Sequence, residues 1–472
     1  MKMKKMILIL MLGLLWSGTL RAQDCECYAP TRQTAVRMME KKEYAKALKL
    51  LRAADACPDK PSDNDLAAKM QECRRAIRKE QERIEAERNR PATPPDDDSS
   101  AGEIVIPLVP RQGGNTGGSE KGAGSGRNGN NVGNRGRDLS ARGTANCYIV
   151  SSPGTYSFPT VKGNSWTSVG NVSRAEVLWE SFGTATAPSK GDIIQSVSYT
   201  TGSGPSEGTI TFSTPSYLRN GNAVIAAKDA YGTILWSWHI WVCSGYDPVA
   251  MGQVYYNNAG TMMDRNLGAT SATPGDVGAL GLLYQWGRKD PFLASGSISS
   301  TTRAESTISW PSPVTSSSHT GTIDYAVEHP TTVIYSSSST DNDWVYTGKD
   351  NTLWQTTKTI NDPCPPGWRV PDGGDDGVWS TAVGSHGSFT GSINKGMNFS
   401  GKFGSSSTIW YPAAGSLEDW DGRLGFDSFG MWWSCTTIAS GAKYLCLSYD
   451  GEVFPSYGHG RAYGCSVRCL QE

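Results

Sequence analysis

Three aspartates near the C-terminus have residue types and spacing that could support chemistry. Asp372, Asp375 and Asp376 stand in a glycine-rich turn, where three carboxylates could wrap a hard cation such as calcium. The turn lacks the alternating ligand spacing of an EF-hand loop, and a solvated acidic turn is the alternative. We therefore expect no cofactor, with calcium as the one metal that the sequence leaves open.

Patterns typical of enzymes are weaker. Glu418, Asp419 and Asp421 could serve glycoside hydrolysis, but carboxylates are common in loops, and spacing alone does not place two of them across a substrate. A cysteine nucleophile needs an imidazole beside it, and the five histidines are scattered. We read His239, within an aromatic strand, as a buried hydrogen-bonded side chain rather than a base. We predict no catalytic residues and no enzymatic activity.

Surface aromatic side chains remain as candidates for ligand binding. The chain has 16 tryptophans and 19 tyrosines, and most should lie in cores because large rings dominate burial in β-rich domains. Trp420, Tyr449 and Tyr457 lie in expected loops or strands of the last domain, where some rings must be exposed. Exposed aromatic faces stack on sugars or proteins, so these three are our ligand-binding candidates.

The N-terminus indicates export. Residues 1–22 combine three lysines, a short apolar run over residues 6–15 and a plausible cleavage site near Ala22, as in a signal peptide. No later stretch is apolar enough for a transmembrane segment. A formal net charge of −1 gives no general attraction to nucleic acid. We expect a secreted, periplasmic or outer-surface protein with no nucleic-acid partner.

Residues 23–90 predict a helical hairpin, since charged residues are dense and apolar ones recur at helical spacing over residues 34–56 and again from Leu66 to Ile84. The run over residues 43–48 resembles one tetratricopeptide repeat unit. A single unit does not predict a solenoid, so we expect a small hairpin or a docking surface for a partner helix. Residues 91–142, rich in Gly, Pro, Ser and Asn, predict a disordered linker.

Residues 143–246 predict an all-β sandwich of immunoglobulin-like architecture, with six or seven short β-branched or aromatic runs separated by turns. In the last run, residues 234–242, side chains should alternate between two faces. Leu235, Ser237, His239 and Trp241 share one face, and Trp236, Trp238 and Ile240 share the other.

Residues 247–472 predict one larger domain with a Ser/Thr-rich excursion over residues 295–339 and a terminal meander. Residues 362–372 contain four prolines, three of them around Cys364 and Gly367, so this loop can be neither a helix nor a central strand. It contains Cys364, for which the final strand offers a partner.

The chain has eleven cysteines, and disulfides are expected after export. We predict Cys364–Cys469, with Cys465 as a small buried hydrophobe, and Cys435–Cys446, which a two-residue turn at Ser440-Gly441 would place opposite each other. Two further pairings are open: Cys147 with Cys243, which could lock the first and last strands of the sandwich, and Cys57 with Cys73, or with Cys25 or Cys27.

The last domain resembles the Fibrobacter succinogenes major paralogous domain of bacterial surface and secreted proteins. The resemblance rests on residues 264–268, 284–288, 362–371, 432–434 and 466–469. It implies an α+β fold similar to the C-type-lectin and formylglycine-generating-enzyme group, with a long disulfide to the last strand, a cell-surface setting and no catalytic residues. Residues 372–379 depart from the family's usual helix start. The overall layout resembles exported proteins of the Bacteroidetes group.

Together these features predict an exported cell-envelope or surface protein for binding or adhesion, which recognises a glycan or a protein without catalysis. One alternative is a hydrolase or sulfatase-modifying-type enzyme in the last domain. The other is a structural subunit of an envelope assembly.

Overall fold

The computed structural model describes residues 28–79 with gaps, and residues 136–202, 208–336, 342–346, 349–384, 389–391, 394–425, 430–439, 441–448 and 450–472. The chain divides into two compact units, Met1–Ser125 and Gly126–Glu472, and each is described by itself. The protein is mostly β-sheet with few helices. The predicted signal peptide and residues 91–135 of the predicted linker lie outside the described residues.

The first unit contains α1 (Tyr28–Glu40) and further helical residues between Tyr44 and Lys79. The pattern over residues 34–56 predicts one helix, but α1 ends at Glu40. Lys42 adopts a left-handed φ of 59°, and Glu43 N–H donates to Met38 O, which closes the turn. The predicted apolar stripes are buried together, at Ala35, Met39, Ala47, Leu51, Ala54, Leu66, Met70 and Cys73. Cys57, the possible partner of Cys73, lies outside the described residues, as do Cys25 and Cys27.

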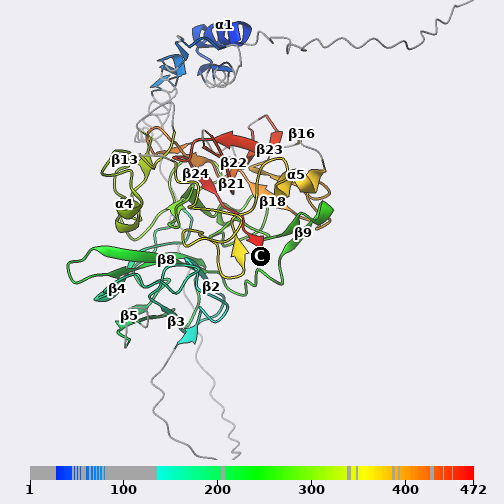
Figure 1. The fold of residues 1–472 in the computed structure, drawn as a ribbon. Helices are drawn as coiled ribbons and strands as arrows, with labels where there is room; N and C mark the ends of the chain where they lie inside the picture. The colour runs from blue at the N-terminus through cyan, green and yellow to red at the C-terminus, as the bar shows by residue number, and fades with distance from the viewer. Residues whose placement is uncertain are drawn as a thin grey trace, which may run out of the picture. The chain divides into compact units, whose positions relative to one another are not determined.

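Two four-stranded sheets form the first part of the second unit (Figure 1). One has the order β1 (Arg137–Asp138), β3 (Thr155–Pro159), β6 (Thr209–Ser213) and β5 (Ser196–Thr200). The other has the order β2 (Cys147–Val150), β8 (Ile234–Val242), β7 (Gly221–Lys228) and β4 (Arg174–Ser181). Side chains from both sheets share one core. Because β1 pairs with β3, the sheet structure begins before residue 143, within the stretch predicted as linker.

The open pairing of Cys147 with Cys243 is wrong. β2 and β8 run parallel, with Cys147 opposite His239 and Val150 opposite Val242. Cys147 therefore begins β2, whereas Cys243 follows the far end of β8, and the two thiols do not form a disulfide. When the first and last strands of a domain are neighbours, the start of the first strand lies beside the end of the last strand only if the two strands are antiparallel.

The sheet of β2, β8, β7 and β4 is buried on both faces. Trp236, Trp238 and Ile240 enter the core between the two sheets, while Trp241 packs against the C-terminal part, so the predicted alternation is confirmed from Trp236 to Trp241. It is wrong at Leu235, which packs against the same core as Trp236, because the register of β7 and β8 shifts at that point. On that second face Trp241 Nε1 donates to Ala269 O at 3.1 Å, and Asn222 Nδ2 donates to Gly268 O at 2.9 Å. Residues 143–246 and 247–472 thus share a core, and neither is an independently packed body.

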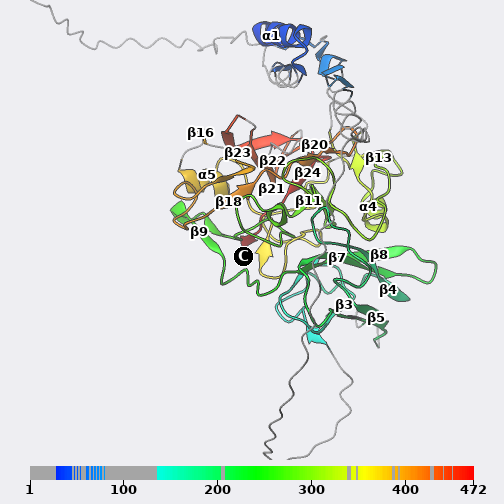
Figure 2. The same ribbon diagram turned by 180° about the vertical axis from the view of Figure 1, so that it is seen from behind.

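The remaining elements build the C-terminal part around a nine-stranded sheet (Figures 1 and 2). Its strands are β11 (Leu282–Gln285), β12 (Phe292–Leu293), β16 (Phe389–Thr390), β19 (Ser416–Leu417), β20 (Leu424–Gly425), β21 (Gly430–Ile438), β22 (Gly441–Leu447), β23 (Glu452–His459) and β24 (Gly464–Ser466). A four-stranded sheet contains β9 (Gln253–Tyr255), β10 (Gly260–Met262), β15 (Trp368–Arg369) and β25 (Leu470–Gln471). Smaller elements are β13 (Val314–Thr315), β14 (Ile334–Tyr335), β17 (Gly396–Asn398), β18 (Trp410–Pro412), α4 (Ile323–Glu328), α5 (Val378–Val383), η1 (Tyr256–Asn258) and η2 (Val277–Ala279). No described helix is both long and apolar enough to cross a bilayer.

The Ser/Thr-rich excursion covers the free edge of β4. Thr307 N–H donates to Glu180 O, and Glu180 N–H donates to the Thr307 hydroxyl. Trp310 packs on Trp179, with ring centroids 5.6 Å apart. The excursion thereby protects an edge strand that would otherwise offer unpaired backbone groups to another chain.

The predicted disulfide Cys435–Cys446 is wrong, because the register of β21 and β22 differs from the simple hairpin. Ile438 lies opposite Gly441 and Thr437 opposite Ala442, so the register already differs at the turn from the one that a Ser440-Gly441 turn would give. An irregularity between Trp433 and Thr437 shifts the pairing again and places Met431 opposite Cys446. A bulge lengthens one strand only, so counting outward from the turn fails beyond it as well. The buried Cys435 thiol instead lies 3.5 Å from Asp372 Oδ1.

The proline-rich loop is held as predicted by the disulfide Cys364–Cys469, with both cysteines buried. Two buried ionic groups support it from inside. The Asp362 carboxylate accepts from Cys364 N–H at 2.8 Å and from Val370 N–H at 2.9 Å. The Lys358 ammonium donates to the carbonyls of Cys364, Pro365 and Trp368. These two side chains therefore satisfy buried backbone groups in a loop whose only regular structure is the two-residue edge strand β15.

We expect Lys358→Met to destabilise the protein by about 2–3 kcal/mol. The substitution keeps much of the side-chain volume but leaves buried carbonyl oxygens without a donor and removes the positive charge near Asp362. The shift in urea midpoint measures the loss, with exposed Lys190→Met as the control. Equal midpoints for the two variants would contradict this account of the loop.

Candidate ligand-binding groove

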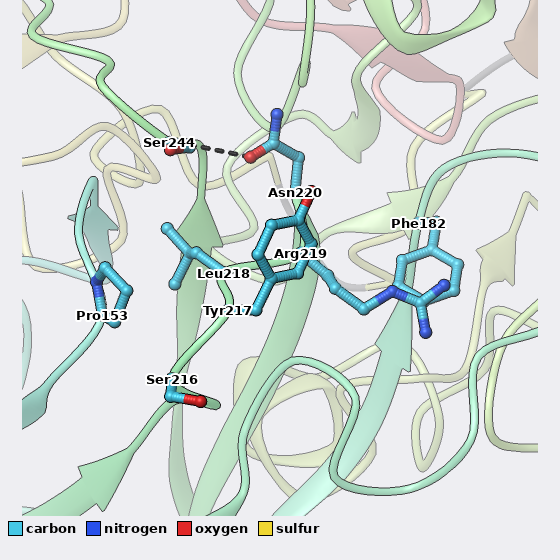
Figure 3. A pocket seen from close by; sticks show the side chains of 8 residues that line it. All are labelled: Pro153, Phe182, Ser216, Tyr217, Leu218, Arg219, Asn220 and Ser244. Carbon is cyan, nitrogen blue, oxygen red and sulfur yellow. Dashed lines mark hydrogen bonds between the residues drawn. The ribbon is translucent and has the colours of Figure 1, made fainter. Parts of the chain in front are cut away.

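One end of the sandwich gathers four chain segments around a groove. β2 and β8 are parallel, and β7 is antiparallel to both β8 and β4. The last residues of β2, β4 and β8 therefore meet the first residue of β7 at one end of the sheet. The chain segments that follow or precede these strand ends form the walls of the groove (Figure 3). The lining residues are Pro153, Phe182, Ser216, Tyr217, Leu218, Arg219, Asn220 and Ser244.

The groove has the size of a small-ligand site and carries an exposed ring. Its volume is about 590 Å³, within the roughly 300–1,000 Å³ of small-molecule pockets. Tyr217 lies in the segment between β6 and β7, and its side chain is 82% exposed. An aromatic side chain this exposed contributes little to a core, so its apolar face is available to a ligand.

Arg219 forms a second flat surface. Its guanidinium lies 4.1 Å from the ring centroid of Phe182 (Figure 3). Its Nη1 donates to Asp192 Oδ2 at 2.8 Å. The ring and the carboxylate together fix the plane of a side chain that is otherwise long and flexible.

Buried groups beneath the groove hold Asp192 in place. The Glu180 carboxylate, at the end of β4, accepts from the backbone N–H groups of Gly191, Ile193 and Ile194 at 2.6–2.9 Å. Asp192 is thus carried by a loop that a buried side chain ties to the sheet. At Gly221 a Cβ atom would lie 2.6 Å from Ser181 O, so only glycine allows β7 to begin this close to β4.

Polar groups at the rim complete the site. Asn220 Oδ1 accepts from Ser244 N–H at 2.8 Å, which links the β6–β7 segment to the residue after Cys243 (Figure 3). The Nδ2 amide of Asn220 and the Ser216 hydroxyl are further hydrogen-bonding groups on exposed side chains. The groove therefore offers two flat surfaces with polar groups beside them.

The two described aromatic candidates from the sequence, Trp420 and Tyr457, do not form one site. Tyr457, on β23, is 43% exposed and packs against Tyr444 and Phe454. Trp420 follows β19, a strand that is not a neighbour of β23 in the sheet, and its Nε1 donates to Glu418 at 3.1 Å. Tyr457 is the more exposed of the two. Tyr449, the third candidate, lies outside the described residues.

The acidic turn does not converge on a cation. The Asp372 carboxylate is engaged by Arg369 at 2.7 Å, whereas Asp375 and Asp376 are exposed at the turn. Across the described residues, no group of three His, Cys, Asp or Glu side chains is placed to hold a metal.

The carboxylates considered for glycoside hydrolysis are largely covered. Glu418 and Asp419 are 7% and 1% exposed, and the Ser416 hydroxyl donates to Glu418 Oε1 at 3.2 Å. Asp421 Oδ1 accepts from the backbone N–H of Arg423. Paired carboxylates of a glycosidase must both reach a sugar in a cleft, and these two buried side chains give no such access.

Cys147, His239 and Asn222 lie together in the manner of a cysteine-hydrolase triad, but the geometry does not activate the thiol. His239 Nε2 faces Asn222 Oδ1 at 2.9 Å, and Nδ1 faces the Tyr284 hydroxyl at 3.5 Å, so both nitrogens are taken. Burial raises the pKa of the Cys147 thiol far above its usual range. A neutral, buried thiol is not a nucleophile, and the reading of His239 as a buried hydrogen-bonded side chain is confirmed.

Comparison with protein-family models, with curated proteins and with solved structures finds no match for this chain. The sequence analysis did not predict the groove. In the sequence, residues 216–220 form a polar segment between two strands, and the only signal is an aromatic and a basic residue two positions apart, Tyr217 and Arg219.

Proposed function

We propose that this protein is an exported cell-envelope or surface protein for binding or adhesion, which recognises a glycan or a protein without catalysis. In this proposal the paired sheets are an immunoglobulin-like sandwich and the C-terminal part is a C-type-lectin-like domain of the major paralogous type. The Cys364–Cys469 link to the last strand agrees with the latter.

The observation that carries the proposal is the groove at the end of the sandwich. It combines an exposed Tyr217 with an Arg219 fixed by Phe182 and Asp192. A rigid frame supports exposed recognition groups there, as in binding proteins whose loops rest on a sheet scaffold. The buried Cys147, Glu418 and Asp419 give the hydrolase alternative less support than this groove gives binding.

Tyr217→Ala should weaken ligand binding by the full chain. The substitution deletes the exposed ring and leaves the buried core unchanged, so the fold should survive while at least about 1 kcal/mol of contact energy is lost, with a corresponding fall in affinity. Glycan and protein arrays probed with both proteins measure the effect.

Tyr457→Ala is the comparison variant, since this exposed tyrosine belongs to the C-terminal part. Signals lost only in Tyr217→Ala place recognition in the groove, and signals lost only in Tyr457→Ala place it on β23. Uniformly blank arrays for the wild-type chain would count against a binding protein of this kind.

A further inference from the structure

We infer that the groove takes an uncharged sugar, with the apolar face of a pyranose ring stacked on Tyr217 and its hydroxyls bonded at the rim. This inference rests on the proposed binding function and names the ligand class. Three features of the groove lead to it: its surfaces, its charge and its rim.

The surfaces fit a saccharide ring. A pyranose presents a flat patch of C–H groups bordered by hydroxyls, and an aromatic face matches that patch. Tyr217 supplies the aromatic face, while the Arg219 guanidinium, stacked on Phe182, is a second plane within the same lining. Neither surface forms the deep apolar hole that a hydrophobic side chain would need.

The charge of the groove is already balanced. Arg219 is its cation, and Asp192 accepts from it at 2.8 Å. The same Asp192 oxygen accepts from Ser189 N–H, and the loop is anchored by Glu180, so the carboxylate is not free to swing away. Lys190 is exposed in this loop, but a solvated lysine is a weak attraction at physiological salt. An acidic ligand would have to compete with Asp192, whereas a neutral one would not.

The rim offers groups that hydroxyls can use. Asn220 Oδ1 accepts from Ser244 N–H, and this bond fixes the orientation of the amide, so that Nδ2 is a donor in a fixed position. The Ser216 hydroxyl can donate or accept. Sugar hydroxyls also act as both donors and acceptors, so this mixed set suits them better than a carboxylate, which only accepts.

The test measures binding of the full chain to neutral oligosaccharides and to oligosaccharides carrying uronic or sialic acids. We expect the neutral set to bind, with an affinity that changes less than about twofold between about 0.05 and 0.5 M salt, because no net charge is neutralised. Tyr217→Ala should weaken binding at least about tenfold, and Tyr217→Phe should keep it within about twofold, since the ring face remains.

Two further variants sharpen the result. Asn220→Asp keeps the acceptor for Ser244 but replaces the donor, and it should weaken neutral-sugar binding several-fold. Tyr231→Ala is the matched control, because that tyrosine is 95% exposed at the turn between β7 and β8, outside the groove lining, and its loss should change nothing.

The remaining outcomes separate this inference from the proposed function. Salt-sensitive binding of acidic sugars alone, lost in Arg219→Gln, overturns the neutral ligand but keeps a binding protein. Binding of a peptide that is lost in Tyr217→Ala likewise overturns the sugar ligand but keeps a binding protein. Neutral-sugar binding that survives Tyr217→Ala overturns the groove as its site. Absence of any glycan or protein ligand overturns both.

Discussion

Removing the disulfide Cys364–Cys469 should cost about 4–5 kcal/mol of unfolding free energy. The bond joins residues 105 positions apart, and closing a loop of about 100 residues in the unfolded chain accounts for about 4.7 kcal/mol by the chain-entropy estimate. It also tethers the proline-rich loop to the final strand β25, whose neighbours are β15 and β10. Urea unfolding of the double variant Cys364→Ala/Cys469→Ala measures the loss.

A reducing agent provides the control for this prediction. It should lower the urea midpoint of the wild-type protein more than that of the double variant, because among the described cysteines Cys435, Cys147 and Cys465 are buried thiols without a disulfide. Cys435→Ala should respond to the reductant like the wild type. A wild-type midpoint unaffected by reduction would show that this bond does not stabilise the fold.

Acid should destabilise the wild-type protein more steeply than the variant His239→Gln. Burial between the sheet and Tyr284 lowers the pKa of His239 to about 3, while in the unfolded chain it stays near 6.5. Between these values the unfolded state binds the extra proton, so unfolding becomes easier as pH falls. This residue alone should cost about 3 kcal/mol at pH 4.5 and about 4 kcal/mol at pH 3.5.

The glutamine variant isolates this contribution, because its amide can still donate to Asn222 Oδ1 and does not titrate. Urea midpoints at pH 7, 5.5 and 4.5 should converge for the two proteins as the pH falls. Carboxylates elsewhere titrate equally in both and cancel in the difference. Parallel pH profiles would mean that folding does not lower the pKa of His239.

The sequence could anticipate features set by local chemistry. Alternation along residues 234–242 places Trp238 and Trp241 on opposite faces, since successive side chains in a strand must point apart. The four prolines of residues 362–372 exclude a helix and a central strand, and the structure shows a disulfide-anchored loop there with only the two-residue edge strand β15. The helical stripes around Ala35 and Leu66 are buried as their spacing predicts.

Tertiary structure alone decided how these elements meet. One bulge in β21 moves Met431 opposite Cys446, and the parallel pairing of β2 with β8 separates Cys147 from Cys243. Periodicity determines which face a side chain takes, but strand order, direction and register depend on contacts between residues far apart in the chain. The groove depends on such long-range contacts, because Phe182, Tyr217 and Ser244 become neighbours only where the ends of β4, β7 and β8 meet.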